Sequence, residues 1–169
     1  TRSKAISQIL ENIDATEISV DPPEFIYSKD FPAYWIRWDY EESERQAFRI
    51  SRDQEMGDFK KWWIRELIST PNPQAERLLL MWHNHFVTAY SGIQEEVHAI
   101  TKQHWTMREL GHTNFRSLAK AMIRDAALLN YLDNDGSSKK QPNENLAREL
   151  MELFVLGEGN YTEKDVKEV

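Results

Sequence analysis

The sequence has 169 residues, with 28 acidic side chains against 21 basic ones and no cysteine, and its formal charge is −7. A hydrophobic content of 40% is too high for a disordered chain, and the negative charge argues against a nucleic-acid binder, which normally carries a basic stripe. The length favours one compact domain, and helix-forming residues outnumber β-branched ones, so we expect an all-α fold.

Residues 1–50 are expected to form one short helix followed by an aromatic-rich, irregular segment. Apolar residues recur at helical spacing over residues 3–13, and Asp21-Pro22-Pro23 then breaks the chain. The aromatic residues of the segment 25–40 are Phe25, Tyr27, Phe31, Tyr34, Trp35, Trp38 and Tyr40. Their spacing fits a strand and a helical turn equally well. Core packing is their favoured role, and a platform for a carbohydrate or a peptide is the alternative.

Residues 51–169 are expected to form a helical core. The first four predicted helices of this core cover residues 53–69, 74–88, 93–110 and 115–132. Apolar side chains cover more than half the circumference of residues 74–88, so we expect this helix to be central and buried. The uncharged stretch around it is shorter than the roughly 20 residues of a membrane span. Asn114 is placed to cap the fourth helix.

The polar loop 133–142 leads into a fifth predicted helix over residues 143–156, with Gly157 as its left-handed end. Asn143, together with Asn145, is expected to cap this helix and to tie it to the loop at Asp133. The fold prediction is therefore a single domain of about six helices packed around residues 74–88, 115–132 and 143–156.

The end of the sequence carries a helix-start signal. Thr162 and Asp165 have capping-box spacing, and Tyr161 and Val166 have the spacing of a hydrophobic staple, so a helix is expected from Glu163. A helix of about two turns has little stability alone. We therefore expect the sequence to be a fragment of a larger domain, with an apolar C-terminal face available for self-association.

Two histidines and two glutamates are the candidate catalytic residues. On a helix wheel, Glu149 and Glu152 lie within about 60° of Asn145, so both carboxylates share one stripe. Carboxylates one turn apart and histidines from another helix could form an acid–base or metal site. We expect Glu149 or Glu152 to hydrogen-bond with His83 or His85, although the two histidines point about 160° apart on one helix.

Neighbouring polar residues are candidates for ligand binding or for a structural network. They are Asn84, Asp133, Asn143, Glu144, Asn145 and Arg148. A divalent metal fits the chemistry of the carboxylate–histidine set, but the His-Glu-x-x-His and Glu-x-x-His patterns are absent and an EF-hand alignment fails at Asp133–Gly136. The sequence therefore assigns no metal and no cofactor. In the structural interpretation, these residues are helix caps and buried hydrogen-bonding groups.

Four motifs in the second half also resemble a known family. They are Trp82-His83-Asn84-His85-Phe86, Asn130–Asn134, Pro142–Phe154 and Gly157–Val166. In this order they resemble the bacterial domain-of-unknown-function 1800 family over residues 53–169, whereas residues 1–50 add no resemblance. The resemblance implies a large, exported bacterial protein of unassigned activity. It transfers no catalytic residue, and many relatives have His where Phe154 stands.

Three functions are compatible with these observations. The first is a non-catalytic helical module of an exported protein, and we rank it slightly ahead. The second is a hydrolase, with or without a metal, that uses His83 or His85 with Glu149 and Glu152. The third is a carbohydrate- or peptide-binding domain that uses the aromatic residues of 25–40. Whether the protein is an enzyme, and which partners it has, are left open.

Overall fold

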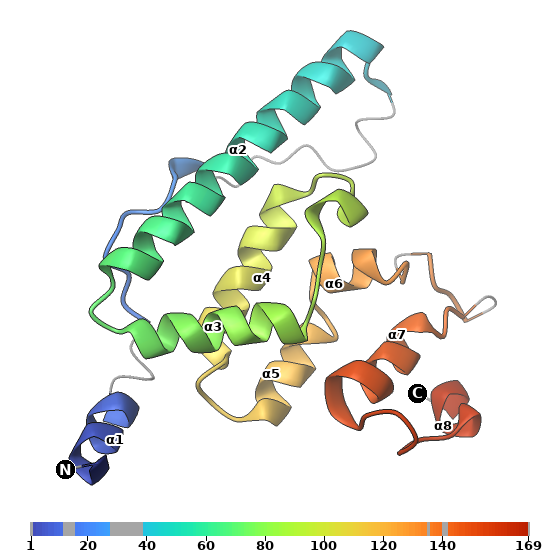
Figure 1. The fold of residues 1–169 in the computed structure, drawn as a ribbon. Coiled ribbons are helices and arrows are strands. Elements are labelled where there is room, and N and C mark those ends of the chain that lie inside the picture. The colour runs from blue at the N-terminus through green and yellow to red at the C-terminus, as the bar shows by residue number, and fades with distance from the viewer. Residues whose placement is uncertain (1, 12–15, 28–38, 135, 140–141, 169) are drawn as a thin grey trace.

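The computed structural model describes residues 2–11, 16–27, 39–134, 136–139 and 142–168, and it is built from helices (Figure 1). The α-helices are α1 Arg2–Glu11, α2 Glu42–Ser69, α3 Pro73–His85, α4 Val97–Leu110, α5 Phe115–Met122, α6 Ala126–Tyr131, α7 Asn145–Glu149 and α8 Glu163–Glu168. Two 3-10 segments, Glu24–Tyr27 and Tyr90–Ile93, and a π-helix, Leu150–Val155, complete the described elements. The all-α prediction is confirmed, and the described residues form more helices than expected.

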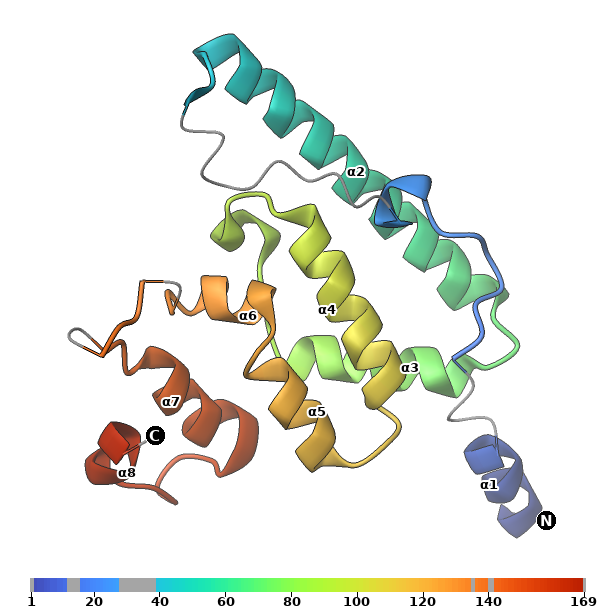
Figure 2. The ribbon, with the colours of Figure 1, turned by 180° about the vertical axis from the view of Figure 1, so that it is seen from behind.

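The central helix is α4, not the predicted helix 74–88. Helices α2, α3, α5 and α6 all contact α4, and the views from both sides show it inside the bundle (Figures 1 and 2). By contrast, α3 packs on one side only and leaves Leu80 and Met81 more than 40% exposed. The buried side chains of α4 include Thr101, Gln103 and Arg108. Such polar residues hide a central helix from a hydrophobicity pattern.

Helix α2 begins eleven residues before its predicted start at residue 53 and runs unbroken across residue 50. Its first turns are almost entirely exposed, so they carry no amphipathic pattern. Their start is stabilised locally, because the backbone N–H of Glu41 donates to the carboxylate of Glu44 at 2.8 Å. The second half buries Met56, Phe59, Trp62 and Glu66.

The predicted helix 115–132 is two helices. Asn114 caps the first one as expected, accepting from the Ser117 N–H at 2.9 Å. The second starts after Asp125, which accepts from the Leu128 N–H at 3.0 Å and from the Gln103 side chain of α4 at 2.8 Å. Asp125, a buried N-cap that is bonded to the central helix α4, therefore divides the predicted single helix into α5 and α6.

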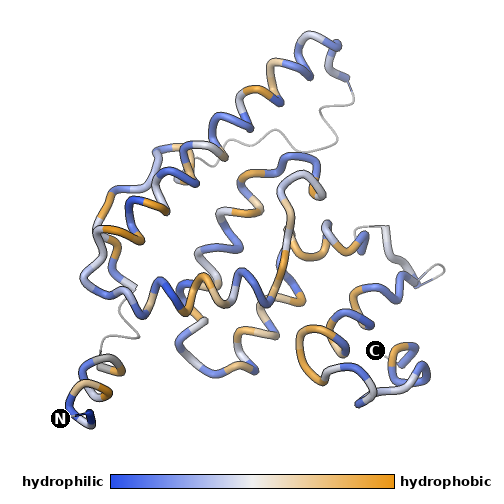
Figure 3. The backbone as a smooth tube through the Cα atoms, in the orientation of Figure 1, coloured by the Kyte–Doolittle hydropathy of each residue, from blue (hydrophilic) through white to orange (hydrophobic). Residues whose placement is uncertain are grey.

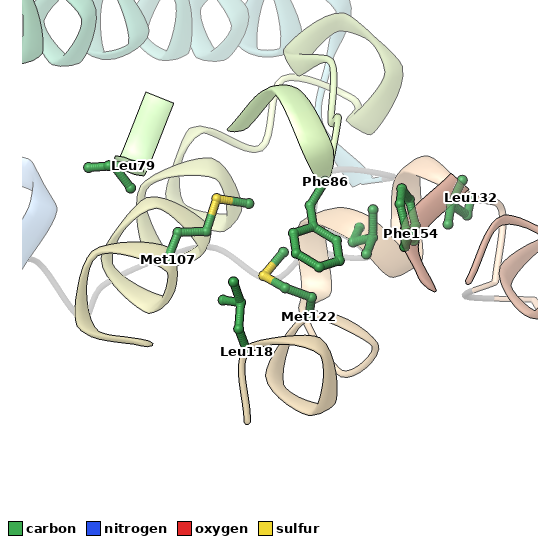
Figure 4. Packing of buried hydrophobic residues seen from close by; sticks show 8 residues of the cluster. Leu79, Phe86, Met107, Leu118, Met122, Leu132 and Phe154 are labelled. Carbon is green, nitrogen blue, oxygen red and sulfur yellow. The ribbon is translucent and has the colours of Figure 1, made fainter. Parts of the chain in front are cut away.

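One apolar cluster joins α3, α4, α5 and α6 to the π-helix. It contains Leu79, Phe86, Met107, Leu118, Met122, Leu128, Leu132 and Phe154. Figure 4 shows Phe154 beside Leu132 and facing Phe86, with 5.2 Å between the two ring centroids. Next to this cluster, a Cβ on Gly111 would lie 2.5 Å from the Trp82 ring, so only glycine permits this contact. The cluster fixes the C-terminal helices on the bundle.

Buried Glu66 ties the N-terminal segment to α2. Its carboxylate accepts from the backbone N–H groups of Ser19 and Val20 at 2.8 Å, and Trp62 Nε1–H donates to the Val20 carbonyl at 2.7 Å. Phe25 packs in the same region, edge-on to His98. These contacts give residues 19–25 a fixed course along α2.

Several expectations for the N-terminal region lie outside the described residues. Phe31, Tyr34, Trp35 and Trp38 are among them. Tyr27 is 65% exposed, and Tyr40 packs edge-on to Phe48. The aromatic platform and the division of the chain at residue 50 therefore stay predictions. None of the described helices is long and apolar enough to cross a membrane.

We predict that Glu66→Ala lowers the free energy of unfolding by about 3 kcal/mol, because it removes the buried carboxylate that accepts from the Ser19 and Val20 N–H groups. Urea denaturation measures this loss. Glu109→Ala, an exposed position on α4, is the matched control and should change stability by less than about 0.5 kcal/mol. Equal losses in the two variants would contradict the role of Glu66.

Candidate functional site

The C-terminal motif forms a helix that changes its winding. It begins at Asn145 rather than at residue 143, runs as α7, and continues as the π-helix Leu150–Val155. The N–H of Leu156 donates to the Met151 carbonyl, five residues back, at 2.8 Å. Gly157 then ends the helix with φ +82°, as predicted for a left-handed cap. π-Helical turns inside α-helices are frequent at functional sites, so this segment is a candidate for one.

The helix-start signal at the end of the sequence is confirmed. The Thr162 N–H donates to the Asp165 carboxylate at 2.8 Å, and α8 begins at Glu163. Val166 is only 3% exposed and packs on Ala147 and Met151. Helix α8 is therefore docked on the helix formed by α7 and the π-helix.

His85 lies at the end of α3 and faces the π-helix. Its Nε2 is 2.9 Å from the Phe154 carbonyl oxygen. A carbonyl only accepts, so Nε2 is the donor, and in the neutral form of an imidazole the other nitrogen, here Nδ1, is an acceptor. Four aromatic rings contact the half-buried imidazole, namely Trp82, Phe86, Phe115 and Phe154. His85 is thus held in one orientation at a partly open, apolar position.

His83 points the opposite way, into the bundle. Its Nε2 is 3.1 Å from Nδ1 of His104, a fully buried residue of α4. Burial, and then the charge of Arg108, lower the pKa of His83 to about 4. Burial, His83 and Arg108 hold the pKa of His104 well below 6.5. Both imidazoles are therefore neutral at pH 7.

The structure does not assemble the four candidate catalytic residues. Glu152 accepts from the Tyr161 hydroxyl, and Glu149 is half-buried. Among the described residues, no hydrogen bond joins either glutamate to His83 or His85, whose ring nitrogens contact His104 and the Phe154 carbonyl instead. The described part of the chain also contains no group of three or more His, Asp or Glu side chains suited to a metal ion.

Sequence reasoning missed His104, the partner that turns His83 inward. The signal was present, because His104 follows Ile100 and precedes Met107 at helical spacing, on the face of α4 that is buried. A histidine on an apolar face needs a hydrogen-bonding partner, and His83 supplies it.

The predicted tie from Asn143 to the loop at Asp133 is present, but the predicted cap is wrong, because Glu144 occupies the N-cap position of α7 and no side chain caps it there. Nδ2 of Asn143 donates to the Asp133 carbonyl at 2.7 Å, and its Oδ1 accepts from the Asn145 N–H at 2.9 Å. Asn145 in turn donates to the Leu132 carbonyl at 3.2 Å. These bonds connect the start of α7 to the end of α6, across the loop.

A polar hollow of about 620 Å³ opens beside this network. The residues that line it are Asp133, Gly136, Pro142, Asn143, Glu144, Asn145 and Arg148. Arg148 forms a two-pronged ion pair with Glu163 of α8, at 2.6 and 3.0 Å, and lies 3.7 Å from Glu144. These two hydrogen bonds favour the charged form of both partners. They therefore lower the pKa of the Glu163 carboxyl group and raise the pKa of the Arg148 guanidinium. Five of the six predicted binding or network residues thus meet here.

Asn84, the sixth residue, lies elsewhere. Its side chain is exposed on α3, with no hydrogen bond to any described residue.

The C-terminal helices carry exposed apolar side chains, namely Leu153, Val155 and Leu156, and Figure 3 shows a hydrophobic stretch at the end of the π-helix. Self-association through this face stays a prediction.

Comparison with known proteins gives one result. A family model described as "Protein of unknown function (DUF1800)" matches residues 2–169. The match extends beyond the motifs of the second half, so our expectation that residues 1–50 carry no resemblance is wrong. The comparisons with curated proteins and with solved structures give no match.

We predict that Asn143→Ala lowers the free energy of unfolding by about 1–2 kcal/mol, because it removes a first-turn acceptor and the bond to Asp133. Thermal and urea unfolding measure the change. The control is Asn84→Ala, the same substitution at an exposed position, which should stay within about 0.5 kcal/mol of the parent. If Asn143→Ala behaved like this control, the network would have no structural role.

Proposed function

We propose that this chain, which belongs to the family described as "Protein of unknown function (DUF1800)", is a non-catalytic helical module. In this proposal the motif residues hold the C-terminal helices on the helical bundle. One observation carries it: the side chains of Asn143, Arg148 and Glu152 each form a bond that joins two separate helices or loops of the same module.

Three contacts support the proposal, and each joins separate segments. Asn143 connects α7 to the loop after α6. Arg148 connects α7 to α8 through Glu163. Glu152 connects the π-helix to Tyr161, directly before α8. A catalytic carboxylate needs reach to a substrate, whereas these groups are engaged in bonds that hold the fold together.

We further propose that the module is part of a large, exported bacterial protein. This context rests on the resemblance of the four motifs alone. A measurement of the cellular location of the full-length protein by fractionation, with and without its natural N-terminus, tests it directly.

The module proposal makes a prediction at Glu152. Glu152→Gln keeps an oxygen that accepts from the Tyr161 hydroxyl, so the melting temperature should stay close to that of the parent. Glu152→Ala removes the acceptor and should lower the melting temperature and increase hydrogen exchange in α8. Differential scanning fluorimetry and hydrogen-exchange mass spectrometry measure the two effects.

The same variants test the alternative. Wild-type protein is incubated with model esters, amides, phosphoesters and glycosides. Turnover that disappears in Glu152→Gln, while its melting temperature is retained, would overturn the module proposal, because only a catalytic carboxylate is sensitive to that change.

One observation favours a hydrolase as the second candidate. The Phe154 carbonyl orients His85 through Nε2, and an imidazole held by one nitrogen presents the other to accept a proton. In this candidate, Nδ1 of His85 is the general base that activates a water or a substrate hydroxyl. His85→Gln should then abolish any turnover found in the substrate panel, whereas His112→Gln, in the turn after α4, should retain it.

A further inference from the structure

The last turn of α3 is held by two imidazoles that point in opposite directions. His83 and His85 are two positions apart, which on a helix places them on opposite sides. His83 contacts His104 between α2 and α4, and His85 contacts the Phe154 carbonyl of the π-helix. The inner contact, between His83 and His104, and the outer contact, between His85 and Phe154, therefore both depend on the position of this turn.

The inner contact lies in a closed aromatic box. His104 has no exposed surface. The rings packed edge-on against it are Phe59, Trp62, Trp63 and Trp105, with centroids 4.7 to 5.7 Å away. Trp63 also lies 4.8 Å from the ring of His83. The box shields the His104 imidazole from water, and His83 is partly buried beside it, so a charge placed on the pair would lose hydration.

The box already contains a buried positive charge. Arg108 of α4 forms an ion pair with Glu76 of α3, and Glu76 also accepts from Trp63 Nε1 at 3.0 Å. Arg108 Nε, Arg108 Nη2 and His104 Nε2 are buried without a partner among the described residues. The charged groups that face the pair are thus Glu76 from α3 and Arg108 from α4, while α2 contributes aromatic rings. Because Glu76 is already paired with Arg108, a second positive charge would find no unpaired carboxylate among the groups that face it here.

We propose that the His83–His104 pair is an acid-sensitive latch whose protonation releases the last turn of α3 from α2 and α4. Release of this turn also breaks the contact between His85 and Phe154. The latch therefore couples the pH to the docking of the π-helix and α8 on the bundle.

The direction of the effect follows from linkage. Burial lowers the pKa of His83 to about 4 in the closed form, whereas an exposed histidine has a pKa of about 6.5. The open form therefore binds protons that the closed form does not bind as the pH falls below 6.5. Between pH 6.5 and about 4, the opening equilibrium constant rises about tenfold per pH unit for each proton taken up. At pH 7 the latch is closed.

Hydrogen-exchange mass spectrometry of the full chain at pH 7, 6 and 5, corrected for intrinsic exchange rates, tests the latch. The opening constant of the amides in residues 150–156 should rise at least about tenfold from pH 6 to pH 5. Far-UV circular dichroism should stay helical over this range. The double variant His83→Gln/His104→Phe should lose the rise, because neither position can then take up a proton.

His98→Gln is the matched control. His98 lies on α4, and burial and Arg52 lower its pKa to about 4 as well, but it is outside the pair. This variant should keep the wild-type rise. If the double variant does not fold, His83→Gln and His104→Gln, which retain hydrogen-bonding side chains, should each reduce the rise. An undiminished rise in both single variants, or a rise of less than threefold in the wild type, would overturn the proposal.

Discussion

Burial of polar side chains on α4 is the constraint on which the rest of the structure depends. Each such group needs a partner, because an unpaired buried donor or acceptor costs about 1–3 kcal/mol. Gln103 pairs with Asp125 and so places the start of α6. His104 and Arg108 pair with groups of α3. These pairs therefore define which helices pack against α4. They also define which part of each helix makes the contact.

The π-helix has a similar double role at the other end of the chain. Its winding turns the Phe154 ring into the core, where it is 5% exposed, while the carbonyl of the same residue accepts from His85. Leu146 and Leu150 pack against the same core, whereas Ala147 and Met151 face α8. One continuous helix therefore contacts the bundle on one side and the last helix on the other.

This arrangement shows how residues of catalytic type can also serve as links between helices. Histidines and glutamates on neighbouring helices are typical of acid–base sites, yet here His83, His85 and Glu152 each bond to a different part of the fold. His83 belongs to the polar core of α4, and Glu152 belongs to the docking of α8. The polar hollow beside Asn143 is lined by groups that connect α6, α7 and α8. Positioning by partners, rather than chemical type, separates a network from a catalytic set.

The sequence by itself determined the local features of this protein. Caps at Asn114 and Thr162, the left-handed end at Gly157 and the tie from Asn143 to the loop follow from interactions over a few residues or over one loop, and all are present. The all-α class followed from composition for the same reason, because helix propensity is a local property.

Only the tertiary structure decided which helix is central, where 115–132 breaks and which way each histidine faces. These features depend on pairs such as His83–His104 and Gln103–Asp125, whose members lie about twenty residues apart. A hydrophobic pattern assigns polar residues to the surface, so it cannot reveal a helix that is buried through paired polar groups. Two groups so far apart in sequence acquire a mutual distance only when the helices pack.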